Sequence, residues 1–207
     1  MDIEQFEARK QEHIRHSLDA AHQAYGLSEL ERIHLIHEAL PELDFNEVKL
    51  DAPCLGRQTA TPFYVAGMTA GHRDALQVNR TLALACQERG WAMGVGSQRR
   101  ESEAGERDSL DQWRNLRQEV PNLILFANIG LRQLITAQLP QIQKLVDDLG
   151  AQALVVHVNA LQETMQLEGT PQFRGGLSAL QKYCNELSCP VVLKETGCGF
   201  SYSTLKR

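Results

Sequence analysis

Short apolar runs alternate with amphipathic stretches along the chain from Thr61 onward. Five of these runs have the length and composition of buried strands, and they lie at 62–67, 92–96, 123–127, 153–158 and 190–193. Stretches that we expect to be helical follow them at about 74–89, 108–119, 131–149 and 177–187. This order predicts repeated βα units and therefore an α/β fold with a parallel sheet.

The run at 151–163, AQALVVHVNALQE, is the most informative of the five because it turns abruptly polar. Side chains alternate along a strand, so Val155, His157 and Asn159 share one face, and Gln162 and Glu163 follow the strand. Parallel α/β sheets place their chemistry at such carboxyl ends, which predicts an active-site strand. Considered alone, the run is more typical of a core strand that leads into an ordinary polar loop.

The other strands favour the active-site interpretation, because polar and small residues recur where each predicted strand ends. These residues are Met68, Thr69 and Gly71, then Gly96, Ser97, Gln98 and Arg99, then Asn128, then His157, Asn159, Gln162 and Glu163, and finally Lys194. The opposite ends carry residues suited to turns and packing, namely Pro62, Trp91, Pro121 and Pro190. We therefore expect a binding site along the carboxyl edge of the sheet.

Residues 1–60 form a separate helical segment in this interpretation, ahead of the strand-rich part at 61–207. The pattern predicts helices over about 3–26 and 28–39, the second beginning with the capping-box pair Ser28 and Glu31. Arg9, Lys10 and His13 lie on neighbouring positions of one helical face and could receive a phosphate, although a solvated basic face is the commoner meaning of such a cluster.

Charge and composition narrow the class of protein. The 207 residues have a formal net charge of -5, so we expect neither nucleic acid nor a membrane surface as a partner. No apolar run approaches the roughly 20 residues of a membrane span, and the chain begins without an apolar leader, which predicts a cytoplasmic location. The five cysteines are odd in number and contain no Cys-x-x-Cys pair, as expected for reduced thiols.

The residue types at the carboxyl edge indicate a phosphorylated ligand. Ser97, Arg99 and His157 together could hold an anion such as a diphosphate, and the Glu163 carboxylate could hold Mg²⁺ with phosphate oxygens. Lys194 would place a cation beside an electron-rich ligand, and glycines such as Gly67 would let a large ligand approach the backbone. Singly, each charged residue also has a purely structural explanation, such as a surface charge or an ion pair of Lys194 with Glu195.

Several motifs, in order, resemble the type 2 isopentenyl diphosphate isomerases. They are Arg9-Lys10, Glu12-His13-Ile14, Ala66-Gly67-Met68-Thr69, Gly96-Ser97-Gln98-Arg99, Ala127-Asn128-Ile129-Gly130, His157-Val158-Asn159, Gln162-Glu163, Glu168-Gly169 and Val192-Leu193-Lys194-Glu195. The resemblance implies a TIM (β/α)₈ barrel of which this chain supplies about the first five βα units. It also implies interconversion of isopentenyl and dimethylallyl diphosphate with Mg²⁺ and reduced FMN, with NADPH as the reductant.

The resemblance also implies a role for each matching residue. Contacts to FMN would come from Met68, Thr69, Ala70, Ser97, Asn128 and Lys194. The substrate would be held by Arg9, Lys10, Ser97, Arg99, His157, Asn159 and Gln162, and Mg²⁺ by Glu163. Gln162 would act catalytically by orienting the allylic end of the substrate, and Lys194 would stabilise the anionic reduced flavin.

The sequence departs from that family in two motifs and in extent. Ala70 replaces a common glycine, and Thr170 follows Glu168-Gly169 where the family often has an acidic residue. Closing an eight-stranded barrel takes three further strands. We therefore expect the 207-residue polypeptide alone to expose two sheet edges and the inner faces of its early strands, to bind FMN poorly and to lack isomerase activity. A complete chain would be expected to form a homo-oligomer.

Two other functions fit parts of the pattern. One is another FMN-dependent barrel oxidoreductase, such as a hydroxyacid oxidase or a dihydroorotate dehydrogenase, which would need neither a diphosphate clamp nor Mg²⁺. Conversion of isopentenyl diphosphate without net consumption of NADPH would distinguish the isomerase from it. The other is a non-catalytic, truncated remnant of the isomerase.

Overall fold

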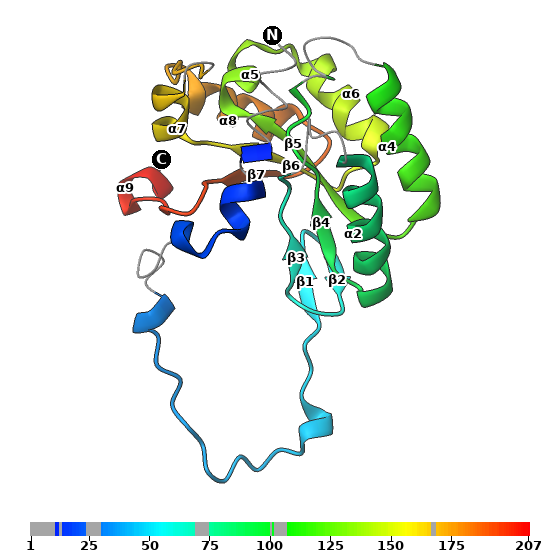
Figure 1. Ribbon diagram of the computed structural model, residues 1–207, viewed down its shortest axis with the longest axis vertical. Coiled ribbons are helices and arrows are strands. Elements are labelled where there is room, and N and C mark those ends of the chain that lie inside the picture. Colours follow the sequence, from blue (N-terminus) through cyan, green and yellow to red (C-terminus); the bar gives the residue numbers. More distant parts are fainter. Residues whose placement is uncertain are drawn as a thin grey trace.

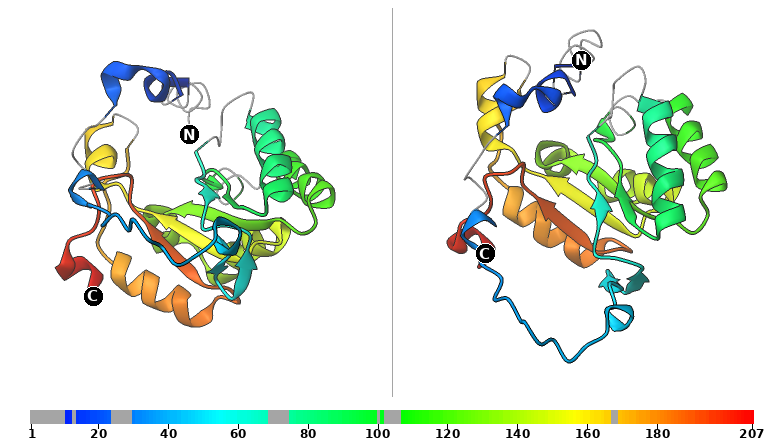
Figure 2. Two further views of the ribbon diagram at one scale, coloured as in Figure 1. Left: turned by 90° about the horizontal axis from the view of Figure 1, so that it is seen from below. Right: turned by 60° about the horizontal axis from the view of Figure 1, so that its bottom comes forward.

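Five parallel strands form the centre of the computed structural model, which describes residues 11–12, 14–23, 30–68, 75–99, 101, 107–166 and 169–207. The strands lie side by side in chain order, as β3 (Tyr64–Val65), β4 (Ala92–Gly94), β5 (Ile124–Gly130), β6 (Ala153–His157) and β7 (Val191–Lys194). All four pairings are parallel, which confirms the predicted sheet. The sheet curls into a half-barrel, as the end-on view of Figure 2 shows.

Helices cover the convex outer face of this sheet (Figures 1 and 2). They are α2 (Ala75–Arg89), α4 (Arg107–Glu119), α5 (Leu131–Thr136), α6 (Leu139–Leu149) and α8 (Gly176–Glu186), and the short α7 (Ala160–Met165) and α9 (Tyr202–Leu205) follow β6 and β7. The prediction of a single helix over 131–149 is wrong, because α5 and α6 are separate helices. Ala137 and Gln138 are extended, and Pro140, which lacks an N–H, lies in the first turn of α6.

The alternation of side chains divides the core into two clusters. On the outer face, Leu125 and Leu154 pack under Trp113 of α4 and Ile142 of α6. On the inner face a smaller cluster comprises Ala92, Ile124, Phe126, Ala153 and Val155. Apolar residues therefore cover both faces of the central strands, which explains why their sequences are nearly continuous in apolar residues.

The expectation that the inner faces of the early strands are exposed holds for β3, where Tyr64, the register partner of the inner-face residue Ala92, is 45 % exposed. It is wrong for the following strands. Phe126 is 6 % exposed and Val155 is 4 % exposed. The antiparallel hairpin of β1 (Ala52–Cys54) and β2 (Arg57–Thr59), which the sequence analysis did not predict, contributes Cys54 to this cluster. The concave curl and the hairpin together bury residues that a flat, uncovered sheet would expose.

Arg117 fastens α4 to the amino-terminal end of the sheet. Its guanidinium donates to five backbone carbonyls, at Val120, Pro121, Leu123, Leu149 and Gly150, over 2.7–3.5 Å. Burial lowers the pKa of Arg117, and the charge of Arg57 lowers it further. A half-buried guanidinium is tolerated here because backbone oxygens replace the water that it has lost.

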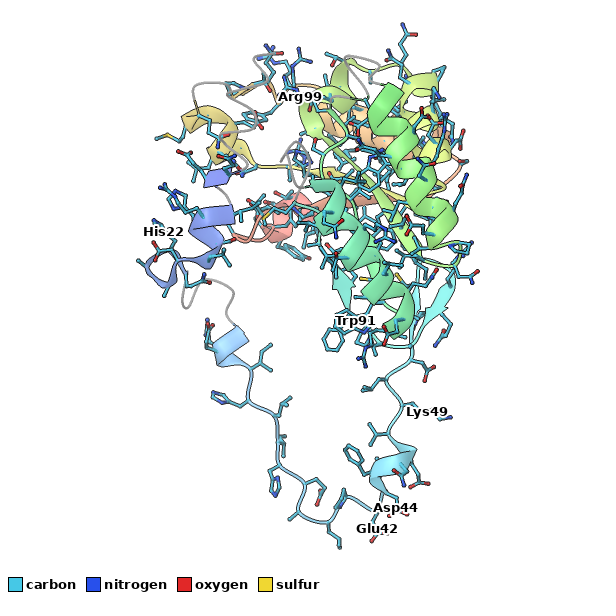
Figure 3. The ribbon with its side chains drawn as sticks, turned by 45° about the vertical axis from the view of Figure 1, so that its right-hand side comes forward. His22, Glu42, Asp44, Lys49, Trp91 and Arg99 are labelled. Atoms are coloured by element: carbon cyan, nitrogen blue, oxygen red, sulfur yellow. The ribbon has the colours of Figure 1, made fainter. Side chains whose placement is uncertain are left out.

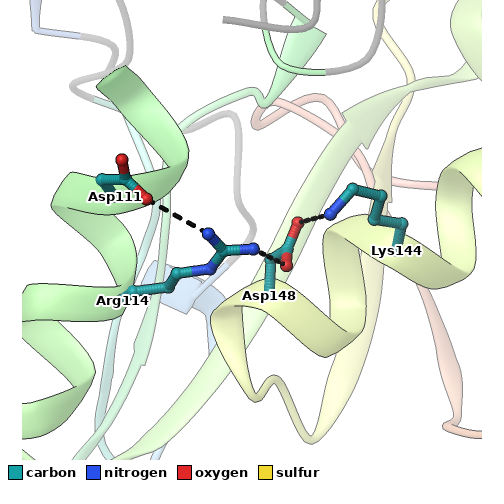
Figure 4. A network of polar contacts seen from close by, with 4 residues as sticks. All are labelled: Asp111, Arg114, Lys144 and Asp148. Atoms are coloured by element: carbon teal, nitrogen blue, oxygen red, sulfur yellow. Dashed lines mark hydrogen bonds and ion pairs between the residues drawn. The ribbon is translucent and has the colours of Figure 1, made fainter. Parts of the chain in front are cut away.

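A second polar network joins α4 to α6 at the surface (Figure 4). Arg114 donates to Asp148 at 2.6 Å and to Asp111 at 3.1 Å, and Lys144 donates to Asp148 at 2.6 Å. The Asp148 side chain is 11 % exposed. Burial alone would raise its pKa, but the hydrogen bonds and charges of Lys144 and Arg114 lower it below the usual value.

The helix expected over 28–39 is not formed in the described residues of that range. After the short 3-10 turns η1 (Ala20–His22) and η2 (Leu30–Arg32), residues 33–38 have no helical hydrogen bonds, and a third 3-10 turn, η3, follows at Phe45–Glu47. This part of the chain arcs away from the sheet before it reaches β1 (Figure 1). Much of the helix expected over 3–26, with Arg9, Lys10 and His13, lies outside the described residues.

Within the described residues, no helix combines the length and the apolar character that are needed to cross a lipid bilayer.

Candidate active site

The carboxyl ends of the parallel strands gather the predicted site residues along one rim. Figure 3 shows Arg99 beyond one end of β4 and Trp91 at the other, so the polar and the packing ends of the strands point in opposite directions. The asymmetry that the sequence predicts is therefore a property of the fold. In parallel α/β sheets this edge is where ligands bind.

Three polar residues from successive strands share the inner face at this rim. His157 is the register partner of Gly130 on β5 and of Lys194 on β7. The His157 ring nitrogen Nδ1 lies 2.8 Å from Oδ1 of Asn128, within hydrogen-bonding distance. Because Val155 and Val192 belong to the inner cluster, alternation places His157 and Lys194 on the same face above it. The structure thus brings Asn128, His157 and Lys194 together.

Asn128 links the end of β4 to His157. Its amide Nδ2 donates to the carbonyl of Val95 at 3.0 Å, and its backbone N–H donates to Oε1 of Gln98 at 3.2 Å. The Gln98 backbone N–H returns to the Asn128 carbonyl at 2.8 Å. Asn128 is 4 % exposed, so its side chain fixes the orientation of His157 from below.

Gln98 is a supporting residue to which the sequence analysis assigned no role. Gln98 is 1 % exposed. Its side-chain Oε1 accepts from the Asn128 backbone N–H and so takes the place of one backbone hydrogen bond between β4 and β5. Its Nε2 has no hydrogen-bond partner within the described part of the chain. Alternation of apolar and polar residues gives no signal for such a bond, because the glutamine follows the strand rather than lying in it.

Two glycines are required by close contacts within the protein. A Cβ at Gly67 would lie 1.9 Å from the Val95 carbonyl oxygen, so the backbone of the first strand touches that of the second there. A Cβ at Gly130 would lie 2.5 Å from Oε1 of Gln133 and 3.2 Å from Nε2 of His157. Gly67 was expected to let a ligand come close to the backbone. In the structure, the backbone of Val95 makes this close contact.

The residues after β6 form the first turn of α7, a helix that the sequence analysis did not predict. Asn159 caps this helix, because its Oδ1 accepts from the Gln162 backbone N–H at 3.1 Å. The Asn159 amide also donates to Oε1 of Gln162. The predicted catalytic and substrate residue Gln162 is therefore held by its predicted neighbour Asn159.

Glu163, the predicted Mg²⁺ ligand, follows Gln162 on α7 and is partly buried. Its Oε2 accepts from the backbone N–H of Thr170 at 2.8 Å and from the Thr170 hydroxyl at 3.2 Å. Among the residues that the structure describes, no cluster of three or more His, Cys, Asp or Glu side chains could hold a metal ion. A cation at Glu163 would therefore need oxygens from its ligand, as Mg²⁺ does when it is bound with phosphates.

The loop after β7 is organised by Glu195 rather than by an ion pair with Lys194. Oε2 of Glu195 accepts from the backbone N–H groups of Gly197, Cys198 and Gly199 at 2.6–2.9 Å. Burial alone would raise the pKa of Glu195, but the donors of Thr196, Gly197 and Gly199 lower it to about 2. Lys194 makes no ion pair with any described residue, so the structural explanation of its charge as a partner of Glu195 is wrong.

The other predicted residues are placed less completely. Ser97 and Arg99 lie at the rim just after β4, both partly buried, and Met68 follows β3 with 44 % of its surface exposed. The two residues at 69–70, predicted to contact FMN, and Arg9 and Lys10, predicted to bind substrate, lie outside the described residues. Of the predicted site residues, the structure thus describes Met68 and those from Ser97 to Lys194.

A cavity of about 730 Å³ lies beside this rim, on the outer side of β7. Val191 and Leu193, whose side chains face the helices, line it together with Leu177 and Leu180 of α8. It reaches the rim at His157, Asn159 and Glu163. The cavity is a mainly apolar space between sheet and helix, although Gln181, Asn185 and Arg207 also line it.

Comparisons with known proteins give a consistent result. No protein-family model matches the chain. Among curated proteins, isopentenyl-diphosphate delta-isomerase of Legionella pneumophila (strain Corby) is 44 % identical over 206 residues, which is all of this chain and 60 % of that protein. The protein of that name from Bdellovibrio bacteriovorus is 43 % identical over 207 residues, covering 98 % of this chain and 59 % of its own length.

The similarity extends to archaea. Isopentenyl-diphosphate delta-isomerase of Methanosarcina mazei is 37 % identical over 194 residues, covering 93 % of this chain and 53 % of that protein. The chain spans about three fifths of the length of the first of these relatives. The motifs and the comparisons agree: the chain is homologous, over its whole length, to the N-terminal portion of the isopentenyl-diphosphate delta-isomerases.

Proposed function

We propose that this chain carries the diphosphate-binding part of an isomerase site that interconverts isopentenyl and dimethylallyl diphosphate. The observation that carries the proposal is the row of Asn128, His157 and Lys194 on one face, reached from three successive strands. The names of the relatives supply the reaction. The half-barrel sheet would be the first five βα units of a TIM (β/α)₈ barrel.

The substrate diphosphate would be held by Ser97, Arg99 and His157. Asn128 fixes the His157 ring through Nδ1, so the remaining ring nitrogen is oriented before a ligand arrives. Arg99 would add a planar, permanently charged donor for phosphate oxygens. Arg9 and Lys10 are proposed as further donors from their place in the matching motif.

Mg²⁺ would be held by the Glu163 carboxylate together with phosphate oxygens of the substrate. One oxygen of this carboxylate accepts from Thr170, and the carboxylate makes no other hydrogen bond or ion pair with a described residue. A single hard oxygen donor fits a cation that keeps several waters and substrate oxygens in its shell. Gln162, on the same turn, would orient the allylic end of the substrate.

FMN would be held by Met68, Ser97, Asn128 and Lys194, and Thr69 and Ala70 are proposed as further contacts from their place in the matching motif. Lys194 fits this group because it is a cation on the inner face and makes no ion pair with a described residue. When bound and reduced by NADPH, FMN would supply the acid/base group for adding a proton at one carbon and removing one from another. Lys194 would stabilise the anionic reduced form.

The proposal can be tested by joining these 207 residues to the part of the Legionella relative that lies beyond the match. We expect the joined protein to convert isopentenyl diphosphate to dimethylallyl diphosphate without net consumption of NADPH. The 207-residue chain alone should show no turnover. Gln162→Leu should lower the rate of the joined protein by about 100-fold, whereas Gln112→Leu on the exposed side of α4 should not.

Three outcomes would contradict the proposal or a part of it. A folded, flavin-containing joined protein that leaves isopentenyl diphosphate unchanged would exclude the isomerase. Stoichiometric oxidation of NADPH would instead favour another flavin-dependent oxidoreductase. Turnover by the 207-residue chain as a monomer would show that no further barrel strands are needed.

A further inference from the structure

Glu163 is held from one side only. Both donors of Thr170, the backbone N–H at 2.8 Å and the hydroxyl at 3.2 Å, point to the same carboxylate oxygen, Oε2. The second oxygen, Oε1, makes no hydrogen bond with any described residue. Two donors on one oxygen fix the plane of a carboxylate and leave the other oxygen for a ligand.

The loop that carries Thr170 is built against α7. The Gln166 N–H donates to the Gln162 carbonyl, and the Gly169 N–H donates to the Gln166 carbonyl, each at 3.0 Å. A Cβ at Gly169 would lie 2.1 Å from the Glu163 carbonyl oxygen, so only glycine permits this approach. The contact between Thr170 and Glu163 is therefore supported by the close packing of Gly169 on the backbone of α7.

Gln162, the residue before Glu163, is likewise held by a residue that flanks α7 in the sequence. Asn159 precedes α7 and binds both the backbone and the side chain of Gln162. Thr170 follows α7 and binds Glu163. Two adjacent residues of one short helix are thus fixed by one residue before it and one after it. Such support lowers the entropy that a side chain loses when it binds a ligand.

We propose that Thr170 is a positioning residue, which holds Oε2 of Glu163 so that Oε1 is presented to a divalent cation bound with the substrate diphosphate. This inference rests on the proposed function, because it takes Glu163 as the ligand of that cation. Thr170 does not touch the cation itself. A neutral donor suits the role, since an acidic side chain in its place would add a second negative charge and could compete for the cation.

The test uses the 207-residue chain, Mn²⁺ as the cation and inorganic diphosphate as the probe. Thr170→Val removes the hydroxyl donor while keeping the shape of the side chain, and Thr170→Ser restores it. Thr164→Val is the matched control, because the Thr164 hydroxyl on α7 donates to the Ala160 carbonyl and not to Glu163. Mn²⁺ affinity in the presence of diphosphate is measured by water-proton relaxation, and diphosphate affinity without metal by calorimetry.

We expect Thr170→Val to weaken Mn²⁺ binding by about fivefold, because it removes the longer of the two hydrogen bonds to Oε2 and keeps the backbone one. Thr170→Ser should recover most of the affinity, and Thr164→Val should leave it unchanged. Diphosphate binding without metal should be the same in all of these proteins, because Thr170 acts only through Glu163. A purely structural role would change both affinities together.

The outcomes separate this inference from the proposed function. If Glu163→Gln abolishes Mn²⁺ binding but Thr170→Val binds Mn²⁺ as the unsubstituted chain does, the positioning role is wrong and the metal site stands. Equal losses of metal-dependent and metal-independent binding in Thr170→Val would also overturn it. If the unsubstituted chain shows no Mn²⁺ binding that depends on Glu163, the proposed metal site is wrong, and this inference falls with it.

Discussion

The strands of the sheet and residues 33–50 are both rich in apolar side chains, yet only the strands bury them. Leu154 on β6 is 0 % exposed, whereas Leu35 is 91 % exposed and Ile36 is 97 % exposed. On the sheet, helices and neighbouring strands cover each apolar face. Residues 33–50 arc away from the body of the protein, as Glu42, Asp44 and Lys49 show in Figure 3.

An apolar pattern therefore predicts a helix or strand only where another part of the protein covers its apolar side chains. Ser28 and Glu31 give 28–39 a helical start signal, and the apolar residues Ile33, Leu35 and Ile36 follow it. Without a surface to cover, a helix of this length is marginal in water, because most helical stability in proteins comes from packing. The strands gain that packing from both sides.

The largest expected effect comes from shortening one leucine in each region. Leu154→Ala should lower the free energy of unfolding by about 3 kcal/mol, because it removes buried methyl groups and leaves a cavity. Leu35→Ala should change it by less than about 0.5 kcal/mol. Urea denaturation of both variants at pH 7 measures the difference. Similar losses in the two would show that residues 33–50 pack on the protein in solution.

Arginines provide the next comparison. Arg117→Gln should cost about 2 kcal/mol, because five backbone carbonyls lose a donor inside the protein. The control is Arg89→Gln, since the Arg89 side chain is 71 % exposed and lies 3.9 Å from Glu88. That variant should unfold at the same urea concentration as the unsubstituted chain. If both variants behave alike, Arg117 does not fasten α4 to the sheet.

The surface network of Figure 4 should contribute less. Asp148→Asn is expected to cost about 1 kcal/mol at pH 7, and Asp111→Asn less, because the Asp111 side chain is 63 % exposed. The pKa of Asp148 is lowered from 3.8. Its contribution is therefore present above that value and is lost as the pH falls through the lowered one. The measurement is the urea midpoint of unfolding. If Asp148→Asn lowers this midpoint by the same amount at pH 7 and at acid pH, the expected pH dependence is wrong.

The smallest effect is local and concerns the loop at 195–199. Glu195→Gln should speed hydrogen exchange of the Gly197, Cys198 and Gly199 amides by about tenfold and leave global stability unchanged. Because the pKa of Glu195 falls from 4.5 to about 2, the same loosening should occur in the unsubstituted chain as the pH drops through that interval. Glu88→Gln, with a side chain 75 % exposed, is the control. Unchanged exchange would mean that the glycines hold the loop without the carboxylate.

Much of the sheet could be predicted from the sequence because its central strands, β4, β5 and β6, are buried on both sides. Every predicted strand overlaps an observed one, and the helix expected at about 74–89 is observed at Ala75–Arg89. The hairpin of β1 and β2 escaped prediction because three-residue strands containing Pro53 give almost no periodic signal. Helix α7 escaped because it is short and follows directly from its cap, Asn159.

The rim was predictable from the order of polar residues along the chain, but its internal contacts were not. His157, Asn128 and Lys194 each follow an apolar run, and parallel strands bring such positions to one edge. The bonds that fix Asn128 to Gln98 and Glu163 to Thr170 depend on the path of loops. Spacing along the sequence does not reveal which loop residues return to a strand end or to a helix.

The most direct test of the candidate site is to measure, by ³¹P NMR titration, how tightly the 207-residue chain binds isopentenyl diphosphate in the presence of Mg²⁺. His157→Ala removes a side chain of the rim, and His34→Ala removes an exposed histidine from residues 33–50. We predict that His157→Ala weakens binding at least about tenfold, as loss of a charge-assisted contact would, while His34→Ala has no effect. Equal affinity of the His157→Ala variant and the unsubstituted chain would contradict a diphosphate site at the carboxyl ends of these strands.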